Sequence, residues 1–280
     1  MSKFQQFIPN QIKPLYSKVR EIRDDIEREL KTQRAEINPR PILILGNQKA
    51  GTSVIAALLG KLTNLSTTID LYKEIYHPLH HQVVQGKLSF EEFVRLNKLD
   101  FSREIIKEPN LTLLYENLLE YFPQSQLVFV VRDPRDNLRS ILNRLKLPGN
   151  LPQLDAKHWE SMSPTWRLIV DSHWLNLPGD NYIEMMAYRW NYMSSLFEKY
   201  SERTILIRYE DFLQDKSQAI TDLAQRLGLN SVNNISDEVD VQYQSRGNRS
   251  VKWQDFFGEK NLHKIDKICF EHLKKLNYLN

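Results

Sequence analysis

Residues 41–59 read PILILGNQKAGTSVIAALL, and this stretch decides which fold the rest of the chain has to complete. The apolar run from Pro41 to Leu45 has the length of a buried strand, and an apolar helical pattern starts at Thr52. A polar turn that begins at Gly46 joins the two. Glycines let the backbone curl so that successive N–H groups point inward, and the N-terminus of a helix adds partial positive charge. The stretch therefore predicts a loop that holds a phosphate.

The position of the lysine separates this loop from the nucleotide-binding pattern G-x-x-x-x-G-K-[ST]. Gly46 and Gly51 have the spacing of that pattern, but Thr52 follows the second glycine and the lysine stands earlier, at Lys49. A lysine after the second glycine reaches the β- and γ-phosphates, and the next hydroxyl binds magnesium. A lysine inside the turn instead points at a phosphate that lies directly on the loop. The pattern disfavours a Walker-type NTPase and leaves an ordinary strand–helix turn as the structural alternative.

Composition and charge set the outer bounds. The 280 residues are 41% hydrophobic and 26% charged, which is ordinary for a globular protein of one domain or at most two. A net charge of +3 is too small to indicate a nucleic acid or a membrane as a partner. The single cysteine, Cys269, excludes an intramolecular disulfide, and no apolar run is long enough to cross a bilayer. Since the N-terminus also lacks the apolar core of a signal peptide, we expect a cytoplasmic protein with one domain over 1–280.

Residues 11–36 carry an amphipathic pattern that predicts an N-terminal helix. Its apolar stripe can pack on the domain, the commoner arrangement, or on a second copy of the chain. Asn38-Pro39 ends the helix and leads into the first strand. The stripe consists of Leu15, Val19, Ile22, Ile26 and Leu30.

Beyond the loop helix, short apolar runs alternate with helical patterns. The runs at 67–71, 104–107, 126–131 and 204–208 predict further strands, and residues 182–200 predict a long helix. Such alternation favours a three-layer α/β fold, with a mainly parallel sheet flanked by helices. Ligands of such sheets bind at the carboxyl ends of the strands.

Charged side chains stand at two of these strand ends. Glu74 lies just past the second strand, and Lys107 closes the third. Three histidines follow Glu74, but no carboxylate or cysteine stands at a fixed spacing from them. We therefore expect solvated loop histidines rather than a metal site at His77, His80 and His81.

Four segments together resemble the sulfotransferases that use 3′-phosphoadenosine 5′-phosphosulfate (PAPS). They are QKAGTS at 48–53, LVFVVRDPRDNLRSIL at 127–142, ILIRYED at 205–211 and SRGNRSVKW at 245–253. The resemblance covers most of the chain from about residue 40 onward, with the segments in family order. It implies the P-loop-like sulfotransferase architecture and an enzyme of the bacterial or glycan-type branch.

The resemblance also implies a binding site for a donor with two anionic ends. The loop would hold the 5′-phosphosulfate, while Arg132 and Ser140 would hold the 3′-phosphate. The structural alternatives are an ion pair of Arg132 with Asp133 or Asp136 and a helix hydroxyl bonded to its own backbone. Val54 replaces the tryptophan that stacks on adenine in the cytosolic branch. The implied donor-binding residues are Gln48, Lys49, Ala50, Gly51, Thr52, Ser53, Arg132, Ser140, Tyr209, Arg246 and Arg249, the last as the alternative cation to Arg246.

Sulfuryl transfer needs an in-line acceptor hydroxyl, a base, and charge stabilisation on the leaving phosphate. Lys49 is the candidate for the last task. The glycan branch has a glutamate base after the second strand, which corresponds to Glu74, assisted by a lysine that corresponds to Lys107. Glu108 and His77 are the alternative bases. Because no triphosphate is split, we expect no metal requirement, and the released product is adenosine 3′,5′-bisphosphate (PAP).

The acceptor is the open part of this prediction. Glu74 favours a carbohydrate, while small metabolites, lipids and phenols remain open. Residues 146–181 are expected to form an irregular acceptor-side insertion, whose three tryptophans either face a sugar or anchor the loop in the core. A small-molecule P-loop kinase and a catalytically silent nucleotide-binding homologue are the rival functions. The sequence does not indicate an oligomeric state.

Overall fold

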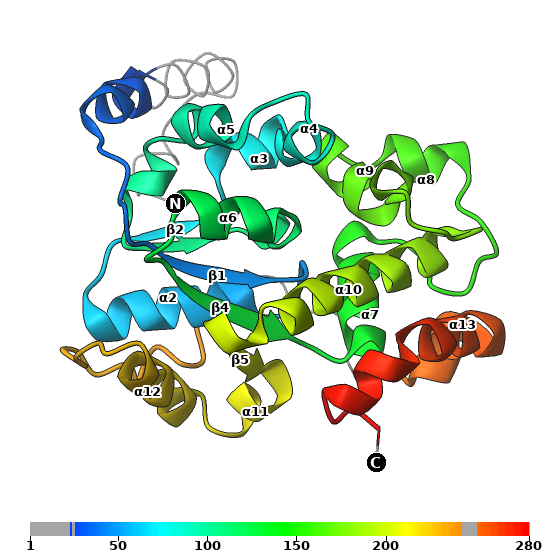
Figure 1. The fold of residues 1–280 in the computed structure, drawn as a ribbon. Helices are drawn as coiled ribbons and strands as arrows, with labels where there is room; N and C mark the ends of the chain where they lie inside the picture. Colours follow the sequence, from blue (N-terminus) through cyan, green and yellow to red (C-terminus); the bar gives the residue numbers. More distant parts are fainter. Residues whose placement is uncertain (1–22, 24–25, 242–250, 280) are drawn as a thin grey trace, which may run out of the picture.

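Five parallel strands form the central sheet, in the order β2-β3-β1-β4-β5 (Figure 1). The computed structural model describes residue 23 and residues 26–241 and 251–279. Leu43 of the central strand pairs with Ile106 on one side and with Leu127 on the other. The strands are β1 (Ile42–Gly46), β2 (Thr67–Ile69), β3 (Ile105–Lys107), β4 (Gln126–Val131) and β5 (Thr204–Arg208).

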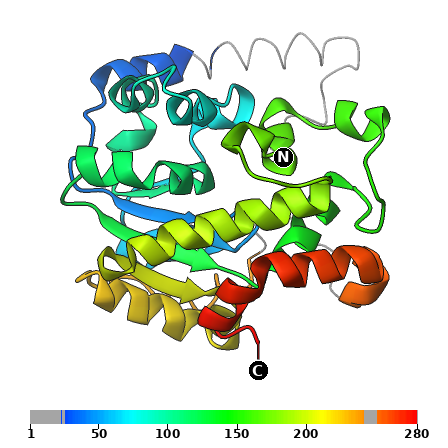
Figure 2. The same ribbon diagram turned by 45° about the vertical axis from the view of Figure 1, so that its right-hand side comes forward.

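Helices cover both faces of this sheet (Figure 2). Short 3-10 helices at Asp100–Ser102, Pro109–Leu114, His173–Leu175 and Ser201–Arg203 lie between them. Besides a helical segment over 26–34, the helices are α2 (Thr52–Thr63), α3 (Tyr72–Tyr76), α4 (His80–Val84), α5 (Phe90–Leu96), α6 (Tyr115–Tyr121), α7 (Pro134–Leu145), α8 (Ala156–Glu160), α9 (Pro164–Val170), α10 (Tyr182–Lys199), α11 (Tyr209–Gln214), α12 (Lys216–Arg226) and α13 (Trp253–Lys275), which is interrupted at Gly258.

The inner strands β1 and β4 are almost entirely apolar because both faces of the sheet are buried there. Successive side chains of a strand point to opposite faces. Ile42 and Ile44 of β1 join a core cluster with α2 and α12, whereas Leu43 and Leu45 join a larger cluster that includes α6, α7 and α10. This arrangement confirms the predicted three-layer α/β fold.

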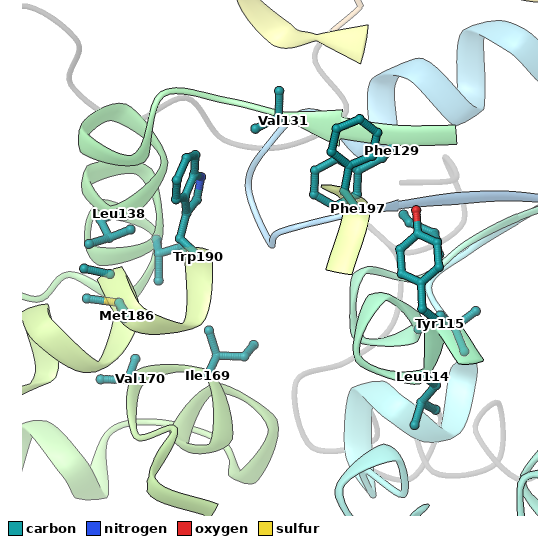
Figure 3. Packing of buried hydrophobic residues seen from close by; sticks show 14 of the residues in the cluster. Leu114, Tyr115, Phe129, Val131, Leu138, Ile169, Val170, Met186, Trp190 and Phe197 are labelled. Carbon is teal, nitrogen blue, oxygen red and sulfur yellow. The ribbon is translucent and has the colours of Figure 1, made fainter. Parts of the chain in front are cut away.

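The long helix α10 contacts both the larger core cluster and the carboxyl edge of the sheet. Phe197 stacks on Phe129 of β4, with ring centroids 4.9 Å apart (Figure 3). Trp190 donates its Nε1–H to the carbonyl oxygen of Arg132 at 3.0 Å, one residue past the end of β4. Met185, Trp190 and Phe197 are all buried, so this face of α10 points into the core.

The segment over 146–181 is less irregular than expected. It forms α8, α9 and a 3-10 helix, and Ile169 and Val170 of α9 are buried in the larger cluster. Trp159 and Trp166 are half-buried and pack against that cluster. Trp174 donates its Nε1–H to the Leu168 carbonyl at 2.9 Å. Trp159 and Trp166 therefore anchor this segment to the core, whereas the hydrogen bond of Trp174 lies within the segment.

The N-terminal helix is described only from its last turns. Leu15, Val19 and Ile22 of the predicted stripe lie outside the described residues. Ile26 and Leu30 are 57% and 51% exposed, so these two residues do not pack on the domain, and packing on a second copy stays a prediction. Arg28 attaches the helix instead, through an ion pair with Asp100 at 2.6 Å. Nowhere in the described chain is a helix both long and apolar enough to span a bilayer.

Candidate active site

A cavity of about 780 Å³ opens at the carboxyl edge of the sheet, where β1 lies between β3 and β4. It is lined by residues that follow all five strands, because the carboxyl ends of parallel strands meet at one edge. The cavity gathers most of the side chains predicted for the site. They are Gln48, Lys49, Gly51, Thr52, Ser53, Glu74, Lys107, Arg132, Ser140 and Tyr209.

The loop between β1 and α2 has the curled backbone that its glycines predicted. Gly46 has a φ of 137°, and a Cβ there would lie 2.3 Å from the Val130 carbonyl oxygen. Gly51 has a φ of 105°, and a Cβ would lie 2.3 Å from the Tyr209 ring. Gly51 starts α2 without a side-chain cap, so the first N–H groups of this helix are left for a ligand.

Hydrogen bonds among four side-chain amides hold this loop in place. Asn137 of α7 donates to the Gln48 carbonyl at 2.8 Å and accepts from Asn47 at 2.9 Å. The Gln48 side chain donates to Asn110 Oδ1 at 2.7 Å. Ala50, another predicted loop residue, faces the core, and its own N–H donates to the Asn47 carbonyl. The loop is therefore positioned before any ligand arrives, which is what electrostatic stabilisation requires.

Arg132 faces the loop from the end of β4. Its Nη1 donates to the Lys49 carbonyl at 3.2 Å, and its guanidinium carbon lies 5.0 Å from the centroid of the Tyr209 ring. Its closest contact with Asp136 is 3.9 Å, while Asp133 forms its ion pair with Arg135 at 2.6 Å. Arg132 is therefore paired with Asp136 and also lines the cavity.

The helix α7 supplies two more groups to the cavity. Ser140 lines it and is half-buried. Arg144 also lines it, one helical turn further on, and was missed in the sequence. The i, i+4 spacing from Ser140 is the signal that would have found it. A basic residue at this position adds a third cation to the wall that carries Lys49 and Arg132.

Glu74 differs from its expected environment. It lies in α3 rather than in a loop and is 1% exposed, although its side chain lines the cavity. Its Oε1 accepts from the N–H groups of Leu79 at 2.7 Å and His80 at 3.2 Å, and its Oε2 lies 2.5 Å from His80 Nδ1. His80 is fully buried, so the expectation of a solvated loop histidine is wrong there. His77 is exposed as expected.

Lys107 and Glu108 lie buried on the same side of the cavity as Glu74. Lys107 forms an ion pair with Asp70, which also lines the cavity. Glu108 accepts from the N–H groups of Leu71 at 3.2 Å and Asn110 at 2.9 Å. Burial, reinforced by the charge of Asp70, raises the pKa of Glu108 to about 8.

Arg189 of α10 is a buried cation close to Glu108, and no sequence pattern indicated it. Its Nη2 donates to Asn110 Oδ1 at 3.0 Å, the same oxygen that accepts from Gln48. Burial lowers the pKa of Arg189 to about 9. Arg189 therefore links α10, through Asn110, to the loop between β1 and α2.

Two predicted residues, Arg246 and Arg249, lie outside the described residues. The described end of that segment is held against α7, where Arg139 donates to the Val251 carbonyl and Trp253 donates to Asp136 at 2.8 Å. Over the described ranges, no group of three or more His, Cys, Asp or Glu side chains is arranged to hold a metal ion.

The sequence profile of the sulfotransferase domain matches residues 39–277. The chain belongs to the sulfotransferase family. The match covers the loop between β1 and α2, the whole sheet and the final helix, and it confirms the resemblance seen in the sequence. This sulfotransferase is therefore an enzyme, built on the fold described above. None of the curated proteins compared with the chain matches it significantly.

Solved sulfotransferases are similar to this one in fold at low sequence identity. The mouse sulfotransferase SULT7A1, solved with PAP, is 15% identical with a TM-score of 0.50, and the alignment covers 86% of each chain. Sulfotransferase STF9 from Mycobacterium avium is 14% identical with a TM-score of 0.49, covering 91% of this chain and 81% of that one. A sulfotransferase from Alicyclobacillus acidocaldarius is 12% identical with a TM-score of 0.47, covering 82% and 96% respectively.

Proposed function

We propose that this sulfotransferase moves a sulfuryl group from PAPS to an acceptor hydroxyl and releases PAP. The observation that carries the proposal is the contact between two anion-binding elements in one cavity. Arg132, at the end of β4, donates to the backbone of Lys49, in the turn after β1. A donor with a phosphosulfate at one end and a phosphate at the other needs two cationic elements at such close quarters.

The residues of the cavity fit this donor in number and chemistry. The uncapped N-terminus of α2 with Lys49, Thr52 and Ser53 suits the phosphosulfate, with Gln48, Ala50 and Gly51 shaping the turn. We assign the 3′-phosphate to Arg132 and Ser140, and we add Arg144. Tyr209 packs on Gly51 and also lines the cavity, beside the adenosine. Arg246 or Arg249 would complete the charge from the late loop.

When bound, PAPS supplies the sulfuryl group; the chain supplies the charge and the base. Lys49 stabilises the negative charge that builds on the leaving phosphate. Glu74 takes the acceptor proton, because it lines the cavity and the N–H groups of Leu79 and His80 and the His80 ring hold its two oxygens in place. Lys107 assists from the end of β3, where Asp70 holds its side chain. Glu108 is the alternative base, since it lines the same wall.

The part of the cavity around Glu74 and Lys107, the proposed acceptor half, also has apolar walls. Ile75 and Tyr76 of α3 line it together with Trp166 and Ile169 of α9. An aromatic and aliphatic surface beside carboxylates suits a neutral, hydroxyl-bearing acceptor, either a carbohydrate or a small molecule. We therefore propose that 146–181 is the acceptor-side segment. A cytoplasmic location, a single domain and independence from metal ions remain predictions from the sequence.

Calorimetry tests the donor assignment. We expect PAP to bind with one molecule per chain, without magnesium, and ATP–magnesium to bind far more weakly. Tighter binding of ATP–magnesium would instead indicate the rival kinase. A screen with labelled PAPS over sugars, phenols and aliphatic alcohols then identifies the acceptor. PAP binding without transfer to any acceptor would indicate the silent homologue.

A further inference from the structure

The buried contact between Glu74 and His80 bears on how the carboxylate of the proposed base is held in place. His80 is the first residue of α4, and its ring is completely buried. Its Nδ1 lies 2.5 Å from Glu74 Oε2, and its backbone N–H also donates to Glu74 Oε1. One residue therefore holds both oxygens of the candidate base.

The protonation of His80 follows from its surroundings. Burial lowers its pKa, and the cation of Arg189 on α10 acts in the same direction against the charge of Glu74. The ring otherwise meets His81 and Trp174, with centroids 6.0 Å and 5.4 Å away. His80 Nε2 has no hydrogen-bond partner among the residues that the structure covers. A neutral imidazole carries one N–H, and its place next to a carboxylate is Nδ1.

The hydrogen bonds of Glu74 leave one direction open. A carboxylate has about four acceptor sites, of which the N–H groups of Leu79 and His80 and the His80 ring use three. Glu74 lines the cavity, whereas His80 lies behind it and does not. The remaining acceptor site is therefore on Oε2, the oxygen that lies next to His80 Nδ1.

We propose that His80 is a positioning residue that fixes the Glu74 carboxylate toward the cavity by donating its Nδ1–H. This role rests on the proposed function of Glu74 as the base. In the transfer step the acceptor O–H bond breaks and its proton goes to the open site of Glu74. The acceptor oxygen bonds to sulfur, and the electron pair of the broken S–O bond leaves with the phosphate of PAP. His80 keeps its proton throughout.

Two substitutions of the same residue separate positioning from packing. In His80→Leu the donor is lost, and we expect kcat to fall on the order of 10- to 100-fold, as is typical when an orienting partner is removed. In His80→Asn the carboxamide N–H takes the place of Nδ1–H, and we expect most of the activity to return. Both variants should bind PAP as tightly as the wild type. His81→Asn, on the neighbouring ring, is the matched control.

A double-mutant cycle shows whether His80 acts through Glu74. Adding His80→Leu to Glu74→Gln should lower turnover much less than it does in the wild type, because the group that it positions is already gone. Turnover is followed as PAP release from PAPS, with water or with the first acceptor found in the screen. Equal losses in both backgrounds, or full activity of His80→Leu, would overturn the proposal.

The hydrogen bond itself has a signature that needs no acceptor. In protein labelled with ¹⁵N-histidine, we expect a strongly downfield Nδ1 proton that is present in the wild type and His81→Asn and absent in Glu74→Gln. Its absence from the wild type would refute the positioning role. Failure of the wild type to bind PAP would instead refute the proposed function, whatever the histidine spectrum shows.

Discussion

The donor and acceptor halves of the cavity are built in different ways. The proposed donor half consists of the turn at 46–53 and of Arg132, Ser140 and Arg144, and the first N–H groups of α2 have no side-chain cap. The proposed acceptor half contains buried side chains that are paired with each other or with a half-buried neighbour, Glu74 with His80 and Lys107 with Asp70. We infer from this difference that the first half is arranged to bind an anion and the second to position a proton acceptor.

The largest expected effect is on the acceptor half. Glu74→Gln removes the proposed base, and we expect kcat to fall on the order of 100- to 10,000-fold, the usual contribution of general base catalysis. PAP affinity should stay unchanged, because Glu74 lies away from the donor loop. Steady-state kinetics and calorimetry measure the two effects. Full activity of this variant would transfer the base assignment to Glu108.

Lys49→Ala removes the cation that is proposed to stabilise the leaving phosphate in the donor half. We expect kcat to fall about 100- to 1,000-fold, the loss that follows removal of one preorganised donor. Lys73→Ala, an exposed lysine on α3, is the control and should keep wild-type rates. If the two variants behave alike in a single-turnover assay, Lys49 does not stabilise the transferred charge.

Arg132→Ala tests the other end of the donor. Loss of a charged hydrogen bond typically costs about 1.5–3 kcal/mol, so PAP should bind about 10- to 100-fold more weakly. Adenosine 5′-monophosphate, which lacks the 3′-phosphate, should bind the variant and the wild type equally. Arg95→Ala, an exposed arginine on α5, is the control. Equal weakening of both nucleotides would place the 3′-phosphate elsewhere.

The smallest effect concerns stability and pH at Glu108. Its pKa is raised from 4.5 to about 8 in the folded protein. Stability from this group is therefore complete at low pH and is lost as the pH rises from about 4.5 to about 8, because the unfolded chain releases the proton first. Urea unfolding of Glu108→Gln should show a flatter pH dependence across this range. Glu120→Gln, an exposed control, should retain the wild-type slope.

Local signals made most of the fold predictable. The strand at 126–131 and the long helix starting at residue 182 were found within a residue or two, since apolar runs and caps mark them. Asn181 and Ser89 accept N–H groups at the starts of α10 and α5. The irregular segment at 146–181 was the exception, because its short helices depend on packing against the core.

The sequence by itself determined the geometry of the loop at 46–53, the core of the proposed donor half, because a strand, a glycine turn and a helix N-terminus form one continuous segment with its own backbone geometry. Only the tertiary structure decided the partners of the acceptor half. His80 meets Glu74 through a tight turn, Asp70 meets Lys107 across two strands, and Arg189 reaches Asn110 from a distant helix. Buried polar and charged groups need hydrogen-bond or ion-pair partners, and no local sequence pattern shows which partners the fold brings together.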